Sequence, residues 1–455
     1  MAVWANRTYR RLFAAQVLAL VGTGLATVAL GLTAYRLAGP DAGLVLSTAL
    51  AIKMTAYVLL APVVTAVADR LPRRAFLVAA DVLRMAVAAA LPFVGHVWQV
   101  YLLIAVLQSA SAAFTPTFQA TIPAVLPDEA DYTRALSLSR LAYDLESLAS
   151  PVLAAALLAV VDARWLFAGT AVGFAASAVL VLGCALPTGR RPAGRGSGRR
   201  RFGDRITRGL RIFAATPRLR AVIGVDLAVA AAGAMVLVNT VVIVRGRLGG
   251  TDPAVALTLG VSGAGSIVAA LLLPRVLTRV SDRAVMLGAT AVLGTVLTGA
   301  AALTVAPPDS WWPVVLAAWA LIGAADCLAQ TPIGRLIRRS GHPGDLPALF
   351  AAQFTVSHLG WLAAYLLAGV LGAVSVPLAF AVLAAVALAG LAQAYRAWPV
   401  TDPDEVEHVH TEPDPEHLAD AAGGPGGWRH THRLVIDDRH RRWPTTRPGS
   451  TAPTT

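Results

Sequence analysis

The feature that most constrains the fold is a series of twelve apolar stretches, each long enough to cross a lipid bilayer as a helix. Such a crossing needs about 20 mainly apolar residues. Of the 455 residues, 56% are apolar and 14% are charged, whereas soluble domains have about 45–50% and 25%. A soluble fold is therefore excluded, and we predict an all-α protein that crosses the cell membrane many times. The stretches cover residues 12–35, 43–68, 75–93, 97–121, 141–161, 165–186, 221–244, 253–277, 284–305, 311–333, 349–373 and 376–398.

A polar interval divides the twelve stretches into two sets of six. We predict an N-terminal six-helix bundle over residues 1–186, a basic linker over 187–220 and a C-terminal six-helix bundle over 221–398. The second half of the linker is amphipathic, which predicts a short helix lying on the anionic surface of the inner leaflet. Residues 399–455 are poor in apolar side chains and rich in Pro, Gly, Asp and Thr, a composition typical of a disordered tail.

Arginines are distributed unevenly between alternate loops. One set of loops carries 25 arginines, and the other set carries four, namely Arg36, Arg164, Arg245 and Arg247. Because cytoplasmic loops are enriched in positive charge, we predict that both termini and the linker are cytoplasmic. The formal net charge of +12 follows from these loops. We expect no nucleic-acid partner, since no aromatic and basic binding motif accompanies the charge.

A short motif lies between the second and third stretches, where residues 65–74 read Thr-Ala-Val-Ala-Asp-Arg-Leu-Pro-Arg-Arg. It resembles the loop signature Gly-x-x-x-Asp-Arg-x-Gly-Arg-Arg of the major facilitator superfamily, with Thr65 and Pro72 replacing the glycines. The equivalent loop of the second half also holds an Asp-Arg pair. The resemblance implies two pseudo-symmetric bundles and a charge relay that latches their cytoplasmic ends. The implied relay residues are Asp69, Arg70, Arg73, Arg74, Asp282 and Arg283.

Ionisable and amide side chains inside the stretches are the candidates for a transport pathway. A charge at the centre of a bilayer costs about 2.5–3.5 kcal/mol, so such groups are functional candidates by default. In the superfamily, the helices that correspond to the seventh and tenth stretches line the central cavity. Residues 146–155 are also similar to an antiporter motif of that superfamily, with its proline kept at Pro151. We predict a substrate or proton pathway through Lys53, Glu146, Asp226, Asp326, Gln330, Gln353 and His358.

Lys53 is the one lysine in the chain, against 37 arginines. Lysine can lose its proton when buried, which arginine cannot, so a proton-transfer role suits Lys53. A structural role as the partner of Asp81 or Glu146 is equally consistent with the sequence.

Asp81 and Arg84 are three residues apart, which suits an ion pair within one helix. His358 suits proton exchange or the binding of nickel or cobalt, and a structural hydrogen bond is the alternative.

Six of the nine histidines lie in the tail. Imidazole and carboxylate groups suit nickel, cobalt, zinc or copper, so the pattern predicts metal capture by the tail, and a solvated tail with incidental histidines is the alternative. The tail, with residues 351–358 and Trp361, resembles the nickel-resistance exporters of the same superfamily. The predicted ligands are His408, His410, His417, His430, His432 and His440.

These features predict a secondary transporter that works by alternating access and exports its substrate in exchange for protons. The second resemblance implies a divalent metal cation such as nickel or cobalt as the substrate. Efflux of amphipathic drugs or secondary metabolites, and a transport-inactive metal sensor, are the alternatives.

We predict no enzymatic activity, because no nucleophile-and-base set or HExxH motif is present. We also predict no cofactor. The expected partners are the lipid bilayer, the small-molecule or metal substrate, and protons.

Overall fold

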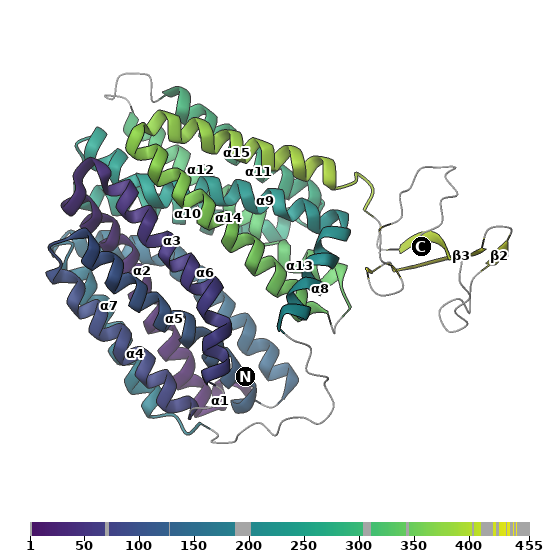
Figure 1. Ribbon diagram of the computed structural model, residues 1–455, viewed down its shortest axis with the longest axis horizontal. Helices are drawn as coiled ribbons and strands as arrows, with labels where there is room; N and C mark the ends of the chain where they lie inside the picture. The colour runs from purple at the N-terminus through teal and green to yellow at the C-terminus, as the bar shows by residue number, and fades with distance from the viewer. Residues whose placement is uncertain are drawn as a thin grey trace.

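Two groups of helices, one from each half of the sequence, form the body of the computed structural model (Figure 1). The structure describes residues 2–68, 72–126, 128–186, 202–303, 311–342, 345–402, 405–410, 422–424, 427–433, 435–436, 440 and 443. The first half contains α1 (Ala2–Ala5), α2 (Arg7–Ala38), η1 (Gly39–Asp41), α3 (Ala42–Ala68), α4 (Arg73–Ala90), η2 (Leu91–Phe93), α5 (Val97–Val125), α6 (Glu129–Leu158) and α7 (Trp165–Leu182). The remainder contains α8 (Phe202–Ala215), α9 (Pro217–Ala234), η3 (Met235–Asn239), η4 (Val242–Arg247), α10 (Asp252–Val276), α11 (Asp282–Leu303), α12 (Trp311–Gln330), α13 (Ile333–Ser340), α14 (Leu346–Val374) and α15 (Val376–Ala397).

The long helices correspond to the apolar stretches of the sequence. Within the described residues, twelve helices of at least 18 residues overlap the twelve predicted stretches one for one. Nine helical segments of this described part are long and apolar enough to cross a membrane. The helical membrane fold is therefore confirmed, while the number of crossings and the side on which the termini lie stay predictions.

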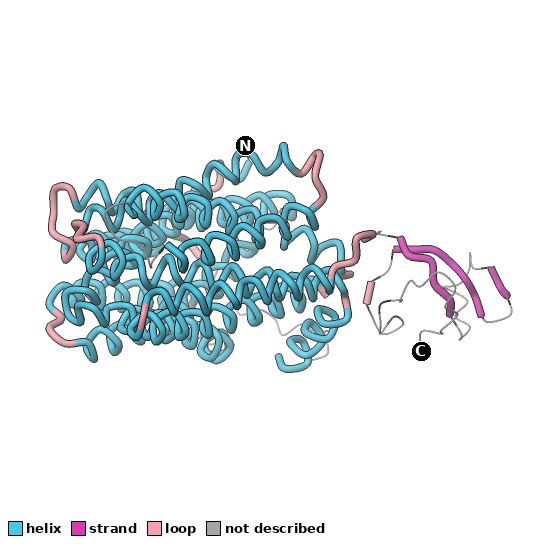
Figure 2. The backbone as a smooth tube through the Cα atoms, turned by 90° about the horizontal axis from the view of Figure 1, so that it is seen from above, coloured by secondary structure: helices cyan, strands magenta, loops and turns pink. Residues whose placement is uncertain are grey.

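The two ends of the helical body differ in charge. We call the end that carries the start of α2, α8, α13 and residues 398–402 the arginine-rich end, and the end that carries η1, η2 and residues 248–251 the opposite end. Figure 2 shows the helices lying side by side between these ends, with the strands beyond the arginine-rich end. The sequence predicts that the arginine-rich end is cytoplasmic.

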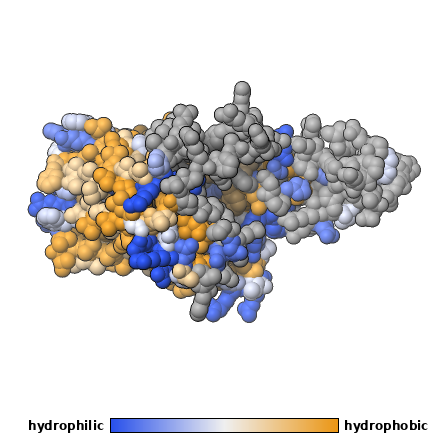
Figure 3. Space-filling view, turned by 90° about the horizontal axis from the view of Figure 1, so that it is seen from below, coloured by the Kyte–Doolittle hydropathy of each residue, from blue (hydrophilic) through white to orange (hydrophobic). Residues whose placement is uncertain are grey.

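The outer surface of the helices is apolar. Large apolar side chains are widely exposed, including Phe93 at 87%, Val172 at 67% and Leu271 at 67% of their surface. On the face seen in Figure 3, hydrophobic groups cover the helices, and hydrophilic groups gather at the left-hand end and in patches along the body. An exposed apolar surface of this extent marks contact with another apolar phase, and a lipid bilayer supplies it.

A buried ion pair stabilises the first half. Asp81 and Arg84 on α4 pair as the sequence predicted, and Ser177 on α7 donates a hydrogen bond of 2.7 Å to Asp81. The Arg84 guanidinium lies 4.0 Å from the centre of the Phe114 ring and 4.6 Å from that of Phe174. Asp81 is fully buried and Arg84 is 4% exposed. The pair therefore joins α4 to α5 and α7.

An Arg84→Met variant is expected to be much less stable, because it leaves the Asp81 carboxylate buried without its charge partner. Removing one partner of a buried pair costs about 3–5 kcal/mol. Thermal unfolding of the purified protein measures the loss, and a double variant Asp81→Asn, Arg84→Met is expected to recover part of it. An unchanged midpoint in the single variant would show that the pair contributes nothing.

The helix predicted in the linker is present as α8, and part of its apolar face is buried. Ile212 and Phe213 are buried, at 0% and 1% exposure. α8 packs against α14 and α9, and Arg208 binds Asp345 through two hydrogen bonds of 2.6 and 3.1 Å. The contacts therefore cover Ile212 and Phe213, and a position of α8 on the surface of the leaflet stays a prediction. α8 belongs to the second half.

Part of the tail is ordered, where the sequence predicted disorder. Strands β1 (Glu405–His410), β2 (Ala422–Gly424) and β3 (Gly427–Arg433) form an antiparallel sheet in the order β1-β3-β2. Composition averaged over the tail hides the local presence of Val406 and Val409 in β1 and of Trp428 and Thr431 in β3. β-branched and aromatic residues of this kind favour strands.

Candidate functional site

The five ionisable side chains predicted for the pathway come from five different helices. Lys53 is on α3, Glu146 on α6, Asp226 on α9, Asp326 on α12 and His358 on α14. Asp226 is buried, with 3% of its surface exposed, and the other four are half-buried. A side chain that faced lipid would be exposed on the surface of the isolated protein. Asp226 therefore faces the interior, and the other four side chains are not fully exposed on the surface.

In the first half, Lys53 and Glu146 lie close enough to interact electrostatically. A Cβ atom added to Gly24 on α2 would lie 3.0 Å from Oε1 of Glu146, so the missing side chain at Gly24 makes room for the carboxylate. Asp81, the other partner considered for Lys53, is bound by Arg84 and Ser177 instead. The electrostatic partner of Lys53 is therefore Glu146.

In the second half, two carboxylates are each held by a glutamine. Asp226 accepts a hydrogen bond of 2.8 Å from Gln353, and both oxygens of Asp326 accept from Gln330 at 2.8 Å. Asp226 and Asp326 also interact electrostatically. The Oε1 atom of Gln353 is buried and has no hydrogen-bond partner among the described residues. Leaving such an acceptor unpaired costs about 1–3 kcal/mol, and a bound ligand or ordered water is a common explanation.

His358 of the second half lies close to α3 of the first half. Its Nδ1 donates to the carbonyl oxygen of Phe354 at 2.8 Å, which leaves Nε2 for another partner. Its ring stacks on that of Phe354, with centroids 3.7 Å apart, and lies 6.4 Å from the ring of Tyr57 on α3. His358 also interacts electrostatically with Lys53. The lysine of one half and the histidine of the other therefore belong to one electrostatic group.

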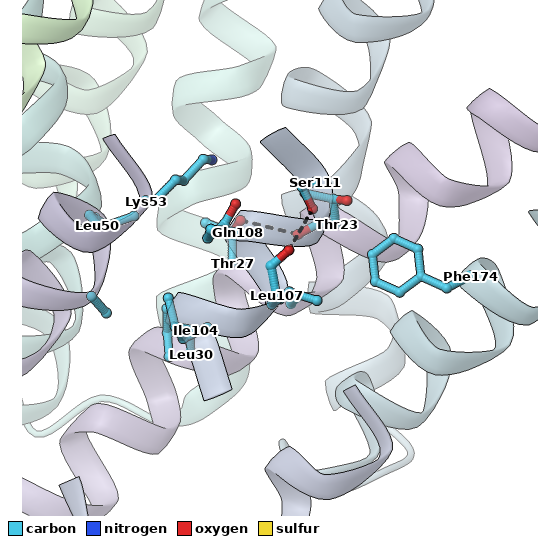
Figure 4. Close-up of a pocket in the computed structure, with 12 residues that line it drawn as sticks. Thr23, Thr27, Leu30, Leu50, Lys53, Ile104, Leu107, Gln108, Ser111 and Phe174 are labelled. Atoms are coloured by element: carbon cyan, nitrogen blue, oxygen red, sulfur yellow. Dashed lines mark hydrogen bonds between the residues drawn. The ribbon is translucent and has the colours of Figure 1, made fainter. Parts of the chain in front are cut away.

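A pocket of about 490 Å³, including the part that is open to solvent, adjoins Lys53. Figure 4 shows Lys53 and Gln108 near Thr23, Thr27 and Ser111, with apolar side chains around them. The hydroxyls of Thr27 and Ser111 donate to backbone carbonyls of their own helices, at 3.1 and 3.0 Å. The lining of the pocket therefore combines a few polar side chains with a majority of apolar ones, and the sequence signalled this only through isolated polar residues in apolar stretches.

The two halves contact each other near the opposite end. α3 packs along α14, and α6 packs along α10. A Cβ atom added to Gly369 on α14 would lie 3.0 Å from the carbonyl oxygen of Gly43 on α3, and the Arg245 guanidinium lies 5.6 Å from the centre of the Tyr35 ring. Small residues permit this close approach. Figure 1 shows the helices of the two halves meeting here and diverging toward the arginine-rich end.

Asn239 belongs to this contact, and sequence analysis missed it. It ends the π-helical segment η3 and is fully buried. Its Nδ2 donates to the carbonyl oxygen of Ala368 at 3.1 Å, while its Oδ1 has no hydrogen-bond partner among the described residues. A Cβ atom added to Gly43 would lie 3.2 Å from that oxygen. π-helical turns are frequent at functional sites, and a lone amide in an apolar stretch was the available signal.

At the arginine-rich end, the relay residues Asp282 and Arg283 bind within their own half. Asp282 pairs with Arg335 and lies 3.9 Å from Arg339 on α13. Arg283 donates to the carbonyl oxygen of Trp398 at 3.1 Å. Arg73 is half-buried and Arg74 is exposed, whereas Asp69 and Arg70 lie outside the described residues. A relay that latches the two halves together therefore stays a prediction.

The structure gives a mixed result for the predicted metal ligands. In the described part of the chain, no three His, Cys, Asp or Glu side chains lie close enough together to hold a metal ion. The side chains of His408, His410, His430 and His432 are not described, although their backbones form strands, and His417 lies outside the described residues. His440 is buried, with 6% of its surface exposed.

Comparisons with known proteins agree with this architecture. A nucleoside transporter is similar in structure, with a TM-score of 0.65 and 14% identity, covering 86% of this chain and 99% of that one. A D-xylose-proton symporter has a TM-score of 0.64 and 15% identity, covering 86% and 97%. A bacterial homolog of the human lysosomal transporter Spinster, in an inward-facing and occupied conformation, has a TM-score of 0.62 and 13% identity, covering 86% and 97%.

These likenesses concern the fold alone, and a comparison with curated proteins found no match. The family model described as Major Facilitator Superfamily matches residues 12–245 and again residues 227–437, so it covers nearly the whole chain. The chain belongs to the major facilitator superfamily and is a membrane transporter.

Proposed function

We propose that this transporter exports a cation in exchange for protons. One observation carries the proposal: each half holds a buried or half-buried pair of interacting ionisable groups, namely Lys53 with Glu146 and Asp226 with Asp326. Carboxylates bind either a proton or a cation, so the same groups can serve both in turn. His358 of the second half interacts electrostatically with Lys53 of the first half, and its imidazole can carry a proton.

The exchange follows from competition for the carboxylates. With the opposite end closed, a cation that enters from the arginine-rich end displaces protons from Asp226 and Asp326. Gln353 and Gln330 hold these carboxylates in place, and the unpaired Oε1 of Gln353 is free to bind the ligand or its water. After the halves rock, protons from the other side displace the cation. Alternating access of this kind is common in transporters built from repeats.

A divalent metal cation such as nickel or cobalt is the first proposed substrate. The oxygens of Asp226 and Asp326, the amide of Gln353 and the free Nε2 of His358 are suitable ligand types for these ions. Their convergence requires the halves to approach each other, because the described residues do not hold three such ligands together.

An amphipathic organic cation is the second candidate, and the aromatic groups of the pathway favour it. Phe354 stacks on His358, and Trp361 lies 5.2 Å from Tyr365 between ring centroids. Rings of this kind bind cations through their faces. A single carboxylate would then suffice to balance the charge of a monovalent organic cation. A metal ion would gain little binding energy from these aromatic side chains.

Membrane vesicles with the arginine-rich end outside test the proposal. An imposed pH gradient, acid inside, is expected to drive uptake of ⁶³Ni²⁺ or of the fluorescent cation ethidium, and collapse of the gradient by a protonophore is expected to stop it. The probe that accumulates identifies the substrate class. Accumulation that persists without the pH gradient would contradict proton exchange.

A further inference from the structure

An amide side chain, Asn239, is enclosed between the two halves at the opposite end. A Cβ atom added to Gly43 of the first half would lie 3.2 Å from its Oδ1 atom, and one added to Gly372 of the second half would lie 2.4 Å from the same atom. The two glycines therefore let the backbones of α3 and α14 approach this oxygen closely. Asn239 is fully buried, and its segment η3 contacts both α3 and α14. The first half thus covers a polar atom that belongs to the second half.

The nitrogen and the oxygen of this amide have different surroundings. Nδ2 donates to the carbonyl oxygen of Ala368 at 3.1 Å and to the Sδ atom of Met235 at 3.4 Å, and both partners belong to the second half. Oδ1 has no hydrogen-bond partner among the described residues. A cavity of about 350 Å³ between the halves, including the part that is open to solvent, is lined by Thr240 but not by Asn239. The nitrogen therefore keeps its partners when the halves move apart, whereas the oxygen meets the other half unpaired.

Closure of the opposite end changes the free energy of this oxygen. Water would satisfy Oδ1 when the halves are apart, and the described contact offers it no donor when they close. A buried acceptor without a partner raises the free energy of the state that buries it, so the closed state alone is destabilised. We propose that Asn239 opposes closure of the opposite end and so sets the ratio of open to closed molecules during alternating access.

Asn239 is thus a positioning residue, which acts through the movement of the halves rather than through contact with the substrate. Transport requires both states to be populated, and a residue whose free energy differs between two states shifts their ratio. An apolar side chain in its place would let the contact of α3 with α14 hold the opposite end shut. The inference goes beyond the proposed function, because it depends on neither a particular cation nor protons.

The test measures the ratio of open to closed molecules in the purified full-length protein, with spin labels on both halves. Gly95 and Thr251 are exposed residues of the opposite end, one in each half. They take the labels as cysteines after Cys184 and Cys327 have been replaced by alanine. The distribution of distances between the two labels, recorded at pH 8 without substrate, gives the two populations.

An Asn239→Leu variant is expected to lower the ratio of open to closed molecules at least about tenfold. Leucine branches at the same carbon as asparagine but has no acceptor to leave unpaired. The carbonyl oxygen of Ala368 keeps the hydrogen bond of its own helix, α14, so no new unpaired group arises there. Asn239→Val, whose side chain is shorter, takes the place of this variant if the leucine variant does not fold.

An Asn239→Asp variant is expected to raise the same ratio at least about tenfold, because burying a carboxylate costs more than burying an amide of the same size. Thr290→Val is the matched control, since it also replaces a buried polar side chain of the second half by an apolar one of similar size. The Thr290 hydroxyl donates to the carbonyl oxygen of Met286 in its own helix, at 2.7 Å. The control is expected to keep the wild-type ratio.

Opposite shifts in the leucine and aspartate variants distinguish this role from simple packing. If Asn239 only packed against its neighbours, both substitutions would weaken the contact and move the ratio toward the open state. That result, or an unchanged ratio in Asn239→Leu, would overturn the proposal. The measurement involves no transported cation and no pH gradient, so a failure of proton exchange leaves its result standing.

Discussion

An Asp326→Asn variant is expected to lose proton-driven transport by about 100-fold or more, the loss that removal of a proton-transferring group typically causes. The asparagine keeps the size of the side chain and can still bond to Gln330, which donates to both oxygens of Asp326 at 2.8 Å. It carries neither the charge that attracts a cation nor an exchangeable carboxyl proton. Uptake of ⁶³Ni²⁺ or ethidium under a pH gradient, at matched amounts of protein, measures the effect.

An Asp162→Asn variant is the control for this experiment. Asp162 lies in the loop between α6 and α7, where its side chain is 74% exposed and lies 3.5 Å from Arg164. A surface pair of this kind contributes little, so transport is expected to stay normal. Full activity of Asp326→Asn would remove Asp326 from the pathway and would leave Asp226 as the carboxylate of the second half.

A Gly369→Val variant is expected to hold the two halves apart at the opposite end. The added side chain would overlap Ser47 and would press on the carbonyl oxygen of Gly43, which lies 3.0 Å from the position of a Cβ atom. Both neighbours belong to the other half, and one is backbone that cannot rotate away. The closed contact between α3 and α14 would open, and the cycle of alternating access would stop.

Spin labels on the two halves at the opposite end measure this change as a longer distance in the variant than in the wild type. Gly360→Val on the same helix is the control, because a Cβ atom there would meet only Ala230 of its own half, at 3.9 Å. If both variants gave the wild-type distance and normal transport, the contact at Gly369 would not limit closure.

The sequence predicted the helical body well, because hydrocarbon requires long apolar helices and little else. It also predicted the Asp81 and Arg84 pair, since residues three apart on a helix are neighbours. Lys53 had two candidate partners, and the contacts between helices distinguish them, because Arg84 and Ser177 bind Asp81 while Glu146 interacts with Lys53. The bond between Gln353 and Asp226 joins residues 127 positions apart, and no periodicity within one helix predicts it.

Other features depend on how segments pair. The apolar residues of α8 are equally suitable for a membrane surface and for α14, and the Arg208 to Asp345 ion pair favours the second. The π-helical segment that ends at Asn239 contacts α14, and no local sequence signal predicted it. In the tail, the histidine spacing of each strand was visible, but the register that places His408 opposite His430 was not.

Proton movement during transport tests the central claim most directly, namely that carboxylates and bases of both halves line one pathway for protons and substrate. Purified protein is placed in liposomes with a pH-sensitive dye inside and no initial pH gradient. A gradient of Ni²⁺ or ethidium is expected to drive protons in the opposite direction, and Asp326→Asn is expected to abolish this movement. Substrate movement through the wild-type protein without any proton movement would contradict the account.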